Sequence, residues 1–271
     1  MDQVRVRLTG AQETLLATLY GRALDARAPR PILRDAMAAG AVDRIDADFK
    51  RTGITPATAK NVAVRAKQFD DWTADFLAGH ERAIVLHLGA GLDTRVWRVA
   101  PGPGVTWYDV DYPEVVALRR TLYPERDHYR MIGSSVTGPD LLEQVPAEDP
   151  VLVVAEGLTM YLTRADGHAL FRRVVDHFPH GTLAFDAFNR TGLWLQQRNA
   201  AVRRTGATLH WAVDDARELE RAVPGLRCVD ALSALYTPGA AALSRAIRVF
   251  AALVRPFPAL RDLDVYYRYT F

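Results

Sequence analysis

The chain has 271 residues, a length that a single large domain with one hydrophobic core can accommodate. Hydrophobic residues make up 49% of the sequence and charged residues 24%, so the composition is that of an ordinary globular protein rather than a disordered one. The 34 basic residues nearly balance the 32 acidic ones, and the net charge of +2 gives no sign of a nucleic-acid-binding surface. This balance favours a small neutral or acidic molecule as the partner.

The cysteine content and the apolar segments indicate the cellular compartment in which the protein is expected. Cys228 is the only cysteine, which excludes an intramolecular disulfide and a multi-cysteine zinc site and fits a reducing environment. Residues 1–10 lack the apolar stretch of a secretion signal, and Arg245 and Arg248 interrupt the most apolar late segment, residues 240–254. We therefore expect a cytoplasmic protein without a metal site or a membrane span.

Residues 1–82 are dominated by helical periodicity, with prolines marking the breaks. We expect them to form a helical cap that belongs to the same domain as the rest of the chain. The predicted helices are Gln12–Arg27, Pro31–Val42 and Pro56–Ala78.

From residue 83 to residue 271, short apolar runs alternate with helical patterns, which indicates βαβ units and a parallel sheet with helices on both faces. Seven strands predict a Rossmann-like α/β core. The predicted strands are Ala83–Leu88, Thr106–Asp109, His128–Ile132, Val151–Ala155, Thr182–Phe188, Arg227–Leu235 and Val265–Phe271. The predicted helices are Pro113–Leu122, Asp140–Val145, Asp166–Phe178 and Ala240–Val254. Residues 189–214, which carry Trp194, His210 and Trp211, are expected to form an inserted lid over the site.

The first of these strands runs into a glycine-rich turn, GAGLDTR at residues 89–95. Gly89 and Gly91 would let a ligand approach the backbone where Cβ atoms would collide, so a nucleotide-type cofactor is the expected occupant. A tight turn without a ligand is the alternative interpretation. Thr94 stands where a dinucleotide fingerprint has its third glycine, so NAD or FAD is not supported.

Two further strands end in carboxylates at the same edge of the sheet. Asp111 is the first choice for gripping the two hydroxyls of a ribose, and Asp109 is the second. A turn aspartate or a helix cap before Pro113 is the alternative for either residue. Glu156 follows the fourth strand, where its carboxylate is suited to meet the ammonium of a methionine moiety or to cap the next turn.

Five short motifs cover nearly the whole chain in a fixed order. They are TLL with YGRA at 14–23, VAVR with FD at 62–70, LGAGLDTR at 88–95, VDYPEV at 110–115 and AEGLTMYL at 155–162. Together they resemble the leucine carboxyl methyltransferase superfamily, and in particular its bacterial TcmP-like branch of polyketide carboxyl methyltransferases. The resemblance implies a seven-stranded class I methyltransferase sheet and S-adenosylmethionine as the cofactor.

The resemblance also implies a role for individual residues. Arg65 would hold the carboxylate of the cofactor, although a surface salt bridge with Asp70 or Asp71 is the alternative suggested by its helix. Many relatives have an Asp-Leu pair near the adenine, whereas this chain has SSVT at 134–137, so Ser135 is either the adenine contact or part of an ordinary polar loop. The implied cofactor-binding residues are Arg65, Gly89, Ala90, Gly91, Asp111, Ser135 and Glu156.

The expected reaction is methyl transfer to an oxygen of a small acid or phenol. A carboxylate, with a pKa of about 4, is ionised at neutral pH and needs no general base, so positioning in a dry pocket would suffice. A phenol would gain from a base such as His87 or His210, and Tyr161 is a further candidate. We expect carboxyl methylation of a polyketide-like natural product. The alternatives are phenol methylation, a silent cofactor-binding protein and a protein C-terminal carboxyl methyltransferase.

Overall fold

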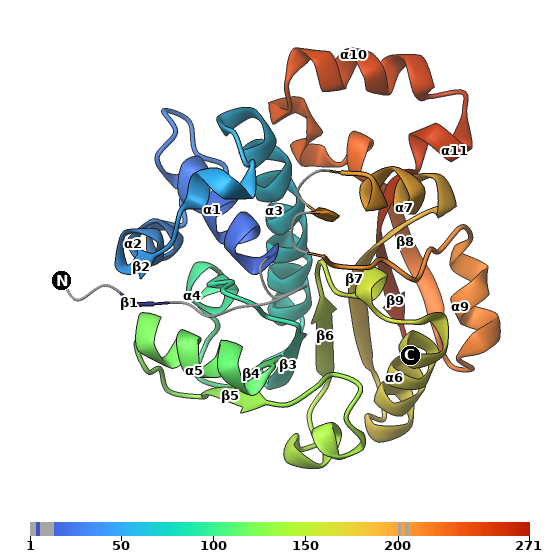
Figure 1. The fold of residues 1–271 in the computed structure, drawn as a ribbon. Coiled ribbons are helices and arrows are strands. Elements are labelled where there is room, and N and C mark those ends of the chain that lie inside the picture. Colours follow the sequence, from blue (N-terminus) through green and yellow to red (C-terminus); the bar gives the residue numbers. More distant parts are fainter. Residues whose placement is uncertain (1–3, 6–13, 200–201, 204–205) are drawn as a thin grey trace.

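The computed structural model describes residues 4–5, 14–199, 202–203 and 206–271 (Figure 1). Its centre is a seven-stranded sheet in the order β5-β4-β3-β6-β7-β9-β8. Strands β5, β4, β3, β6 and β7 run parallel, and β9 is antiparallel to both of its neighbours. The strands are β3 (Ala83–Leu88), β4 (Val105–Asp111), β5 (Tyr129–Gly133), β6 (Val151–Ala155), β7 (Gly181–Phe188), β8 (Arg227–Ser233) and β9 (Asp264–Thr270). The predicted Rossmann-like α/β class is therefore confirmed.

The central strands follow directly from the sequence. Every residue of β3 and β6 is buried, which matches their apolar runs, interrupted only by His87 of β3, and their position inside a parallel sheet. Both strands have the predicted bounds. The other strands differ from the prediction by one or two residues at their ends.

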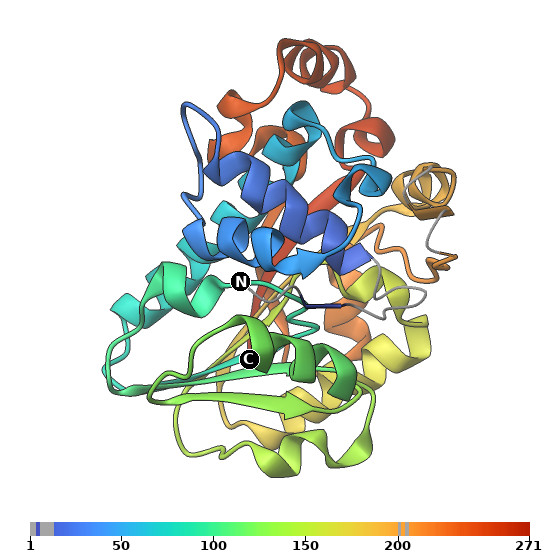
Figure 2. The same cartoon turned by 60° about the vertical axis from the view of Figure 1, so that its left-hand side comes forward.

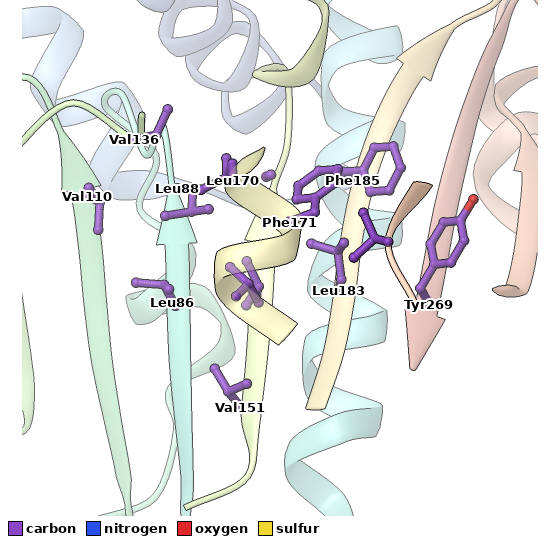
Figure 3. Packing of buried hydrophobic residues seen from close by; sticks show 14 of the residues in the cluster. Leu86, Leu88, Val110, Val136, Val151, Leu170, Phe171, Leu183, Phe185 and Tyr269 are labelled. Carbon is purple, nitrogen blue, oxygen red and sulfur yellow. The ribbon is translucent and has the colours of Figure 1, made fainter. Parts of the chain in front are cut away.

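Helices cover both faces of the sheet, as expected. On one face, α6 (Arg164–His177), α9 (Ala216–Ala222) and the 3-10 helix η3 (Pro139–Gln144) pack on alternate strand residues. Figure 3 shows Phe171 of α6 beside Phe185 of β7, and their ring centroids lie 5.1 Å apart. On the other face, α3 (Pro56–Ala78) packs through residues such as Phe69 and Trp72, and α4 (Arg95–Val99) packs through Val96.

The N-terminal helices lie over the upper end of the sheet, where the parallel strands end (Figure 1). They are α1 (Thr14–Ala26) and α2 (Ala36–Arg44), which pack with the 3-10 helix η2 (Phe49–Thr52) and α5 (Pro113–Leu122). The short strands β1 (Val4–Arg5) and β2 (Ile45–Asp46) pair beside them. Residues 12 and 13 of the predicted first helix lie outside the described residues.

The second predicted helix begins later than expected. The side chain of Asp25 accepts hydrogen bonds from the backbone N–H groups of Ile32 and Leu33, which hold residues 31–35 in a loop. Helix α2 begins at Ala36, where Asp35 is the N-cap and accepts the N–H of Ala38. The prediction of a helix from Pro31 was therefore wrong.

The segment predicted as one helix over residues 240–254 is split in two. Ser244 caps a new helix by accepting the N–H of Ile247, so the 3-10 helix η6 (Pro238–Ala242) precedes α10 (Arg245–Val254). The neighbouring elements are α7 (Arg190–Gln197), η4 (Thr159–Tyr161), η5 (Ala234–Tyr236) and α11 (Pro258–Arg261). Figures 1 and 2 both show α10 and α11 at the same end of the sheet as α1 and α2. In the described part of the chain, no helix has the length and apolar character needed to cross a membrane.

Candidate active site

A cavity of about 1130 Å³ lies where the parallel strands end, beneath residues of α1, α3 and α10. This volume is slightly above the range of about 300–1,000 Å³ that is typical of small-molecule sites. Every residue implied by the resemblance lines it: Arg65, Gly89, Ala90, Gly91, Asp111, Ser135 and Glu156. The structure thus brings together residues that are 91 positions apart in the sequence, such as Arg65 and Glu156. Their binding of the cofactor stays a prediction.

The turn after β3 has the backbone that its glycines were expected to provide. Gly89 has a φ of 63° and Gly91 a φ of 50°, values that residues with a side chain rarely adopt. A Cβ atom at Gly89 would lie 3.1 Å from Cδ1 of Leu158 and would intrude on the cavity wall. The turn therefore leaves bare backbone at the point where a ligand can approach.

Asp111 ends β4 and is tied to the glycine turn. Its Oδ2 accepts the N–H of Gly91 at 2.7 Å, and its Oδ1 accepts the N–H of Tyr112 at 2.8 Å. Tyr112 is the N-cap of α5 and that helix has no side-chain cap, so Asp111 is not its cap. Burial raises the pKa of the Asp111 carboxyl, and these backbone donors oppose the effect. Asp111 is a fixed acceptor with lone pairs left for a bound hydroxyl.

Asp109, the second choice, faces the interior. It accepts hydrogen bonds from the ring N–H of Trp107 at 2.8 Å and from the hydroxyl of Tyr129 at 2.6 Å, and it pairs with the buried Arg119. Burial would raise the pKa of this carboxyl, but the charge of Arg119 and the contact with His87 hold it below its usual range. Asp109 is therefore a structural group below the site.

His87 borders the cavity but both of its ring nitrogens are engaged. Nδ1 lies 3.0 Å from Oδ1 of Asp109, and Nε2 lies 3.3 Å from Nη1 of Arg95. The ring is 2% exposed. His210 is exposed and does not line the cavity. Neither histidine is placed to take a proton from a ligand in this cavity.

A buried cluster of charges lies at the end of β6. Glu156 meets Nε of Arg65 through Oε1 at 2.9 Å and Nη2 of Arg95 through Oε2 at 2.5 Å. Asp186 of β7 meets Nη1 of Arg65 through Oδ2 at 3.1 Å and accepts the N–H of Gly157 at 2.6 Å. Burial would raise the pKa of Glu156, but the two guanidinium groups outweigh it and the pKa lies below its usual range.

The alternative partners predicted for Arg65 are taken by other residues. Asp70 pairs with Arg95 and Arg98, and Asp71 pairs with Lys67. The surface salt bridge is therefore wrong, and Arg65 instead points into the cavity wall between two strand ends. Asp186 was missed, although an acid inside the apolar run of residues 181–188 was a visible signal.

Ser135 and Tyr161, two further candidates from the sequence, also line the cavity. Ser135 contacts the hydroxyl of Thr137 at 2.8 Å and accepts the N–H of that residue, so it belongs to a local turn at the cavity edge. Tyr161 directs its hydroxyl toward Oγ1 of Thr14 at 3.5 Å. Burial raises the pKa of Tyr161, so its phenol stays protonated at neutral pH.

Beyond Glu156, the cavity continues under two helical segments. The predicted lid, residues 189–214, contributes Gln196, Asn199, Val202 and Leu209 to its wall. Trp211 does not line the cavity and is instead buried against Phe171 of α6. A further part of the wall was not predicted: it comes from residues between β8 and β9, namely Ala234, Leu235, Leu243, Ile247 and Phe250.

The leucine carboxyl methyltransferase family model matches residues 15–175, which is more than half of the chain. The chain belongs to the leucine carboxyl methyltransferase family. The match confirms the predicted resemblance. The protein is therefore an S-adenosylmethionine-dependent methyltransferase, as predicted. The residues that line the cavity fit this cofactor, because Gly89 leaves a cradle that a Cβ would fill and fixed carboxylates stand on either side of it.

Two named methyltransferases are similar to this chain over most of their length. The tetracenomycin polyketide synthesis O-methyltransferase TcmP of Streptomyces glaucescens is 47% identical over 98% of both chains. The S-adenosyl-L-methionine-dependent methyltransferase dpfgK of Gibberella zeae is 37% identical over 87% of this chain and 86% of its own.

Solved structures share the fold at low sequence identity. A duf574 family protein from Streptomyces avermitilis has a TM-score of 0.59 at 13% identity and covers 92% of this chain and 96% of its own. The magnesium protoporphyrin IX methyltransferase ChlM from Synechocystis PCC 6803, with bound S-adenosylhomocysteine, has a TM-score of 0.50 at 12% identity, covering 82% of this chain and 92% of its own. These likenesses support the fold alone.

Proposed function

We propose that this methyltransferase transfers the methyl group of S-adenosylmethionine to a carboxylate oxygen of a small polyketide-like acid. The observation that carries the proposal is the lack of an available histidine base in the described cavity lining. His87 is held at both nitrogens, and His210 lies outside the cavity. A carboxylate is already ionised at neutral pH and needs no base, whereas a phenol does.

The cofactor-binding half of the proposal uses the strand ends on one side of the cavity. Asp111 would accept hydrogen bonds from the ribose hydroxyls, and the bare backbone of Gly89, Ala90 and Gly91 would lie along the methionine segment. Arg65 would pair with the carboxylate of the cofactor and Glu156 with its ammonium. Ser135 would face the adenine. Each of these roles is a proposal based on the position of the residue at the cavity.

For this reaction the protein needs mainly to align the acceptor oxygen with the methyl group and to exclude water from the site. S-adenosylmethionine would supply an electrophilic methyl group, and the sulfur would be the leaving group when an acceptor oxygen attacks the methyl carbon. The apolar wall made by Leu209, Leu243, Ile247 and Phe250 would exclude water from the acceptor. Opposite charges on acceptor and sulfonium disappear together in the transition state, so a poorly solvating pocket favours reaction.

Residues 1–82 and 189–214 fit into this proposal as a cap and a lid. Both contribute cavity residues from outside the sheet, such as Thr18 of α1 and Gln196 of α7. We propose that they enclose the acceptor and select it. The name of TcmP, a polyketide synthesis O-methyltransferase, supports a polyketide-like acceptor for this chain.

The proposal is tested with S-adenosylmethionine labelled in the methyl group and pairs of aromatic acceptors. Each pair contains a hydroxylated aromatic acid and its carboxamide, which keeps the phenol but has no carboxylate. We expect label in the acid and none in the carboxamide, and the product should release labelled methanol in mild alkali because it is an ester. Equal labelling of the carboxamide, with a product stable to alkali, would show phenol methylation and overturn the proposal.

A further inference from the structure

We propose that Asp264 binds the methyl acceptor by donating a hydrogen bond from its protonated carboxyl group to the acceptor carboxylate. The inference rests on the carboxylate acceptor proposed above. It adds a specificity residue on the acceptor side of the cavity, from a strand that carries none of the family motifs described above.

The position of Asp264 follows from the sheet. It is the first residue of β9 and lies opposite Phe188, the last residue of β7, and both line the cavity. Of the proposed cofactor residues, Asp111 ends β4, and Gly89 and Glu156 follow β3 and β6. These three strands are neighbours in the sheet. Strand β9 lies two positions beyond β6, past β7. Asp264 therefore borders the half of the cavity left for the acceptor.

The carboxyl group of Asp264 differs from the other acids around it in its hydrogen bonds. Glu156 is paired with Arg65 and Arg95, and Asp186 is paired with Arg65 and the N–H of Gly157. Oδ1 of Asp264 is buried yet has no hydrogen-bond partner within the part of the chain that the structure describes. A buried polar atom is rarely left without a partner. Because Asp264 lines the cavity, a turn of its carboxyl group would bring this oxygen to an acceptor bound there.

The surroundings of Asp264 fix its protonation state. Burial raises the pKa of its carboxyl, the charges of Asp186 on β7 and Glu156 after β6 raise it further, and Arg65 on α3 opposes them. The result is a pKa of about 8. On its own strand, the neighbouring ionisable group is the phenol of Tyr266, whose pKa is also raised by burial and by Asp264. At neutral pH the Asp264 carboxyl is mostly neutral and is a hydrogen-bond donor.

A neutral acid suits an anionic acceptor. An ionised carboxylate in this position would repel the acceptor, whereas a protonated one orients it. In the reaction, an oxygen of the acceptor carboxylate bonds to the methyl carbon, the carbon–sulfur bond breaks, and its electron pair stays on sulfur. No proton moves, and Asp264 keeps its proton throughout. The residue therefore acts in binding, and its loss should appear in KM more than in kcat.

Two substitutions separate the neutral donor from an ionised base. Asp264→Asn keeps a donor of the same shape, and Asp264→Ala removes it. We expect Asp264→Asn to retain wild-type KM for the acid within about threefold at pH 7, and Asp264→Ala to raise it about tenfold or more. Asp262→Asn is the matched control, because Asp262 lies nearby in sequence, pairs with Arg261 and does not line this cavity.

The pH dependence of kcat/KM distinguishes a binding role of Asp264 from a merely structural one, because a structural role would not change it. As pH rises through about 8, wild-type kcat/KM should fall because ionised Asp264 repels the acceptor, whereas Asp264→Asn should show no such fall. Binding of S-adenosylhomocysteine, measured by calorimetry, should stay within about twofold in the variants and shows that they are folded.

Three results would overturn the inference. One is a loss of activity in Asp264→Asn as large as in Asp264→Ala with the cofactor product still bound, because the ionised form would then be required. Another is an unchanged KM in Asp264→Ala. The third is an alkaline fall that persists in Asp264→Asn, which decides the matter even if the alanine variant does not fold. Failure of the proposed function is distinct, because it appears in wild type as an alkali-stable product.

Discussion

Arg65 is the residue whose removal tests the charge cluster and the cofactor site together. Its guanidinium lies 2.9 Å from Glu156 and 3.1 Å from Asp186, whose side chains are only 5% and 0% exposed, while its own side chain is 18% exposed. Arg65→Ala would leave two buried carboxylates short of a partner. Breaking a buried ion pair in this way costs about 3–5 kcal/mol, and we expect the free energy of unfolding to fall by that amount.

Substitution by lysine should separate charge from geometry. The planar guanidinium meets both carboxylates and also lines the cavity, whereas an ammonium is a point charge that cannot span them. Arg65→Lys should therefore retain part of the stability but little of the cofactor affinity. For Arg65→Ala we expect the dissociation constant for S-adenosylhomocysteine to rise about tenfold or more, which corresponds to about 1.5–3 kcal/mol for a charge-assisted hydrogen bond.

Calorimetry with two ligands isolates the contact. 5′-Methylthioadenosine lacks the amino-acid end of the cofactor, so wild type and variant should bind it almost equally. Lys67→Ala is the control on the same helix, since Lys67 pairs with Asp71 and both side chains are more than two-fifths exposed at 44% and 49%. Its removal should change stability by no more than about 0.5 kcal/mol. Equal losses for both ligands in Arg65→Ala would refute the proposed cofactor contact, and a loss of stability as small as that of Lys67→Ala would refute the role of the buried pairs.

Four other predictions follow from the site and the fold. Asp111→Ala should stay folded but weaken binding of S-adenosylhomocysteine by about 1–3 kcal/mol in calorimetry, and unchanged affinity would move the ribose contact elsewhere. Gly89→Ala should lower stability by about 1–2 kcal/mol in denaturant unfolding, because of its positive φ, and should impair cofactor binding, whereas Gly40→Ala in the open face of α2 should not destabilise. Between pH 4 and pH 8 folded Asp264 holds a proton that the unfolded chain has lost, so wild-type stability should fall as pH rises, and Asp264→Asn should remove that fall in Tm measurements from pH 5 to pH 9. S-adenosylhomocysteine should bind far more tightly than NAD, and the reverse order in calorimetry would contradict the cofactor assignment.

The parts of the fold that could be predicted are those specified by local chemistry. The largely apolar runs 83–88 and 151–155 have the bounds of β3 and β6 because a strand buried on both faces favours apolar residues at nearly every position, His87 being the exception. Helix α3 begins at Pro56 because Thr55 caps it and proline fits its first turn. Glycines and acids that directly follow such strands, including Asp111 and Glu156, were within reach of the same reasoning.

The parts that could not be predicted depend on contacts between distant segments. Asp264 reaches the site only because β9 inserts antiparallel beside β7, which brings it opposite Phe188. The late start of α2 depends on a side chain outside the helix, Asp25, which holds the preceding loop. The wall from η5 to α10 likewise lies on the cavity because both of its ends join strands of the sheet. No local pattern in the sequence specifies any of these contacts.

The most direct test of the account is the position of S-adenosylhomocysteine in a crystal structure of the complex. The account predicts ribose hydroxyls within hydrogen-bonding distance of Asp111 and the amino-acid end between Arg65 and Glu156. It further predicts that the sulfur faces the part of the cavity lined by Phe188 and Asp264. A ribose held by another residue, or a sulfur turned away from Phe188, would contradict it.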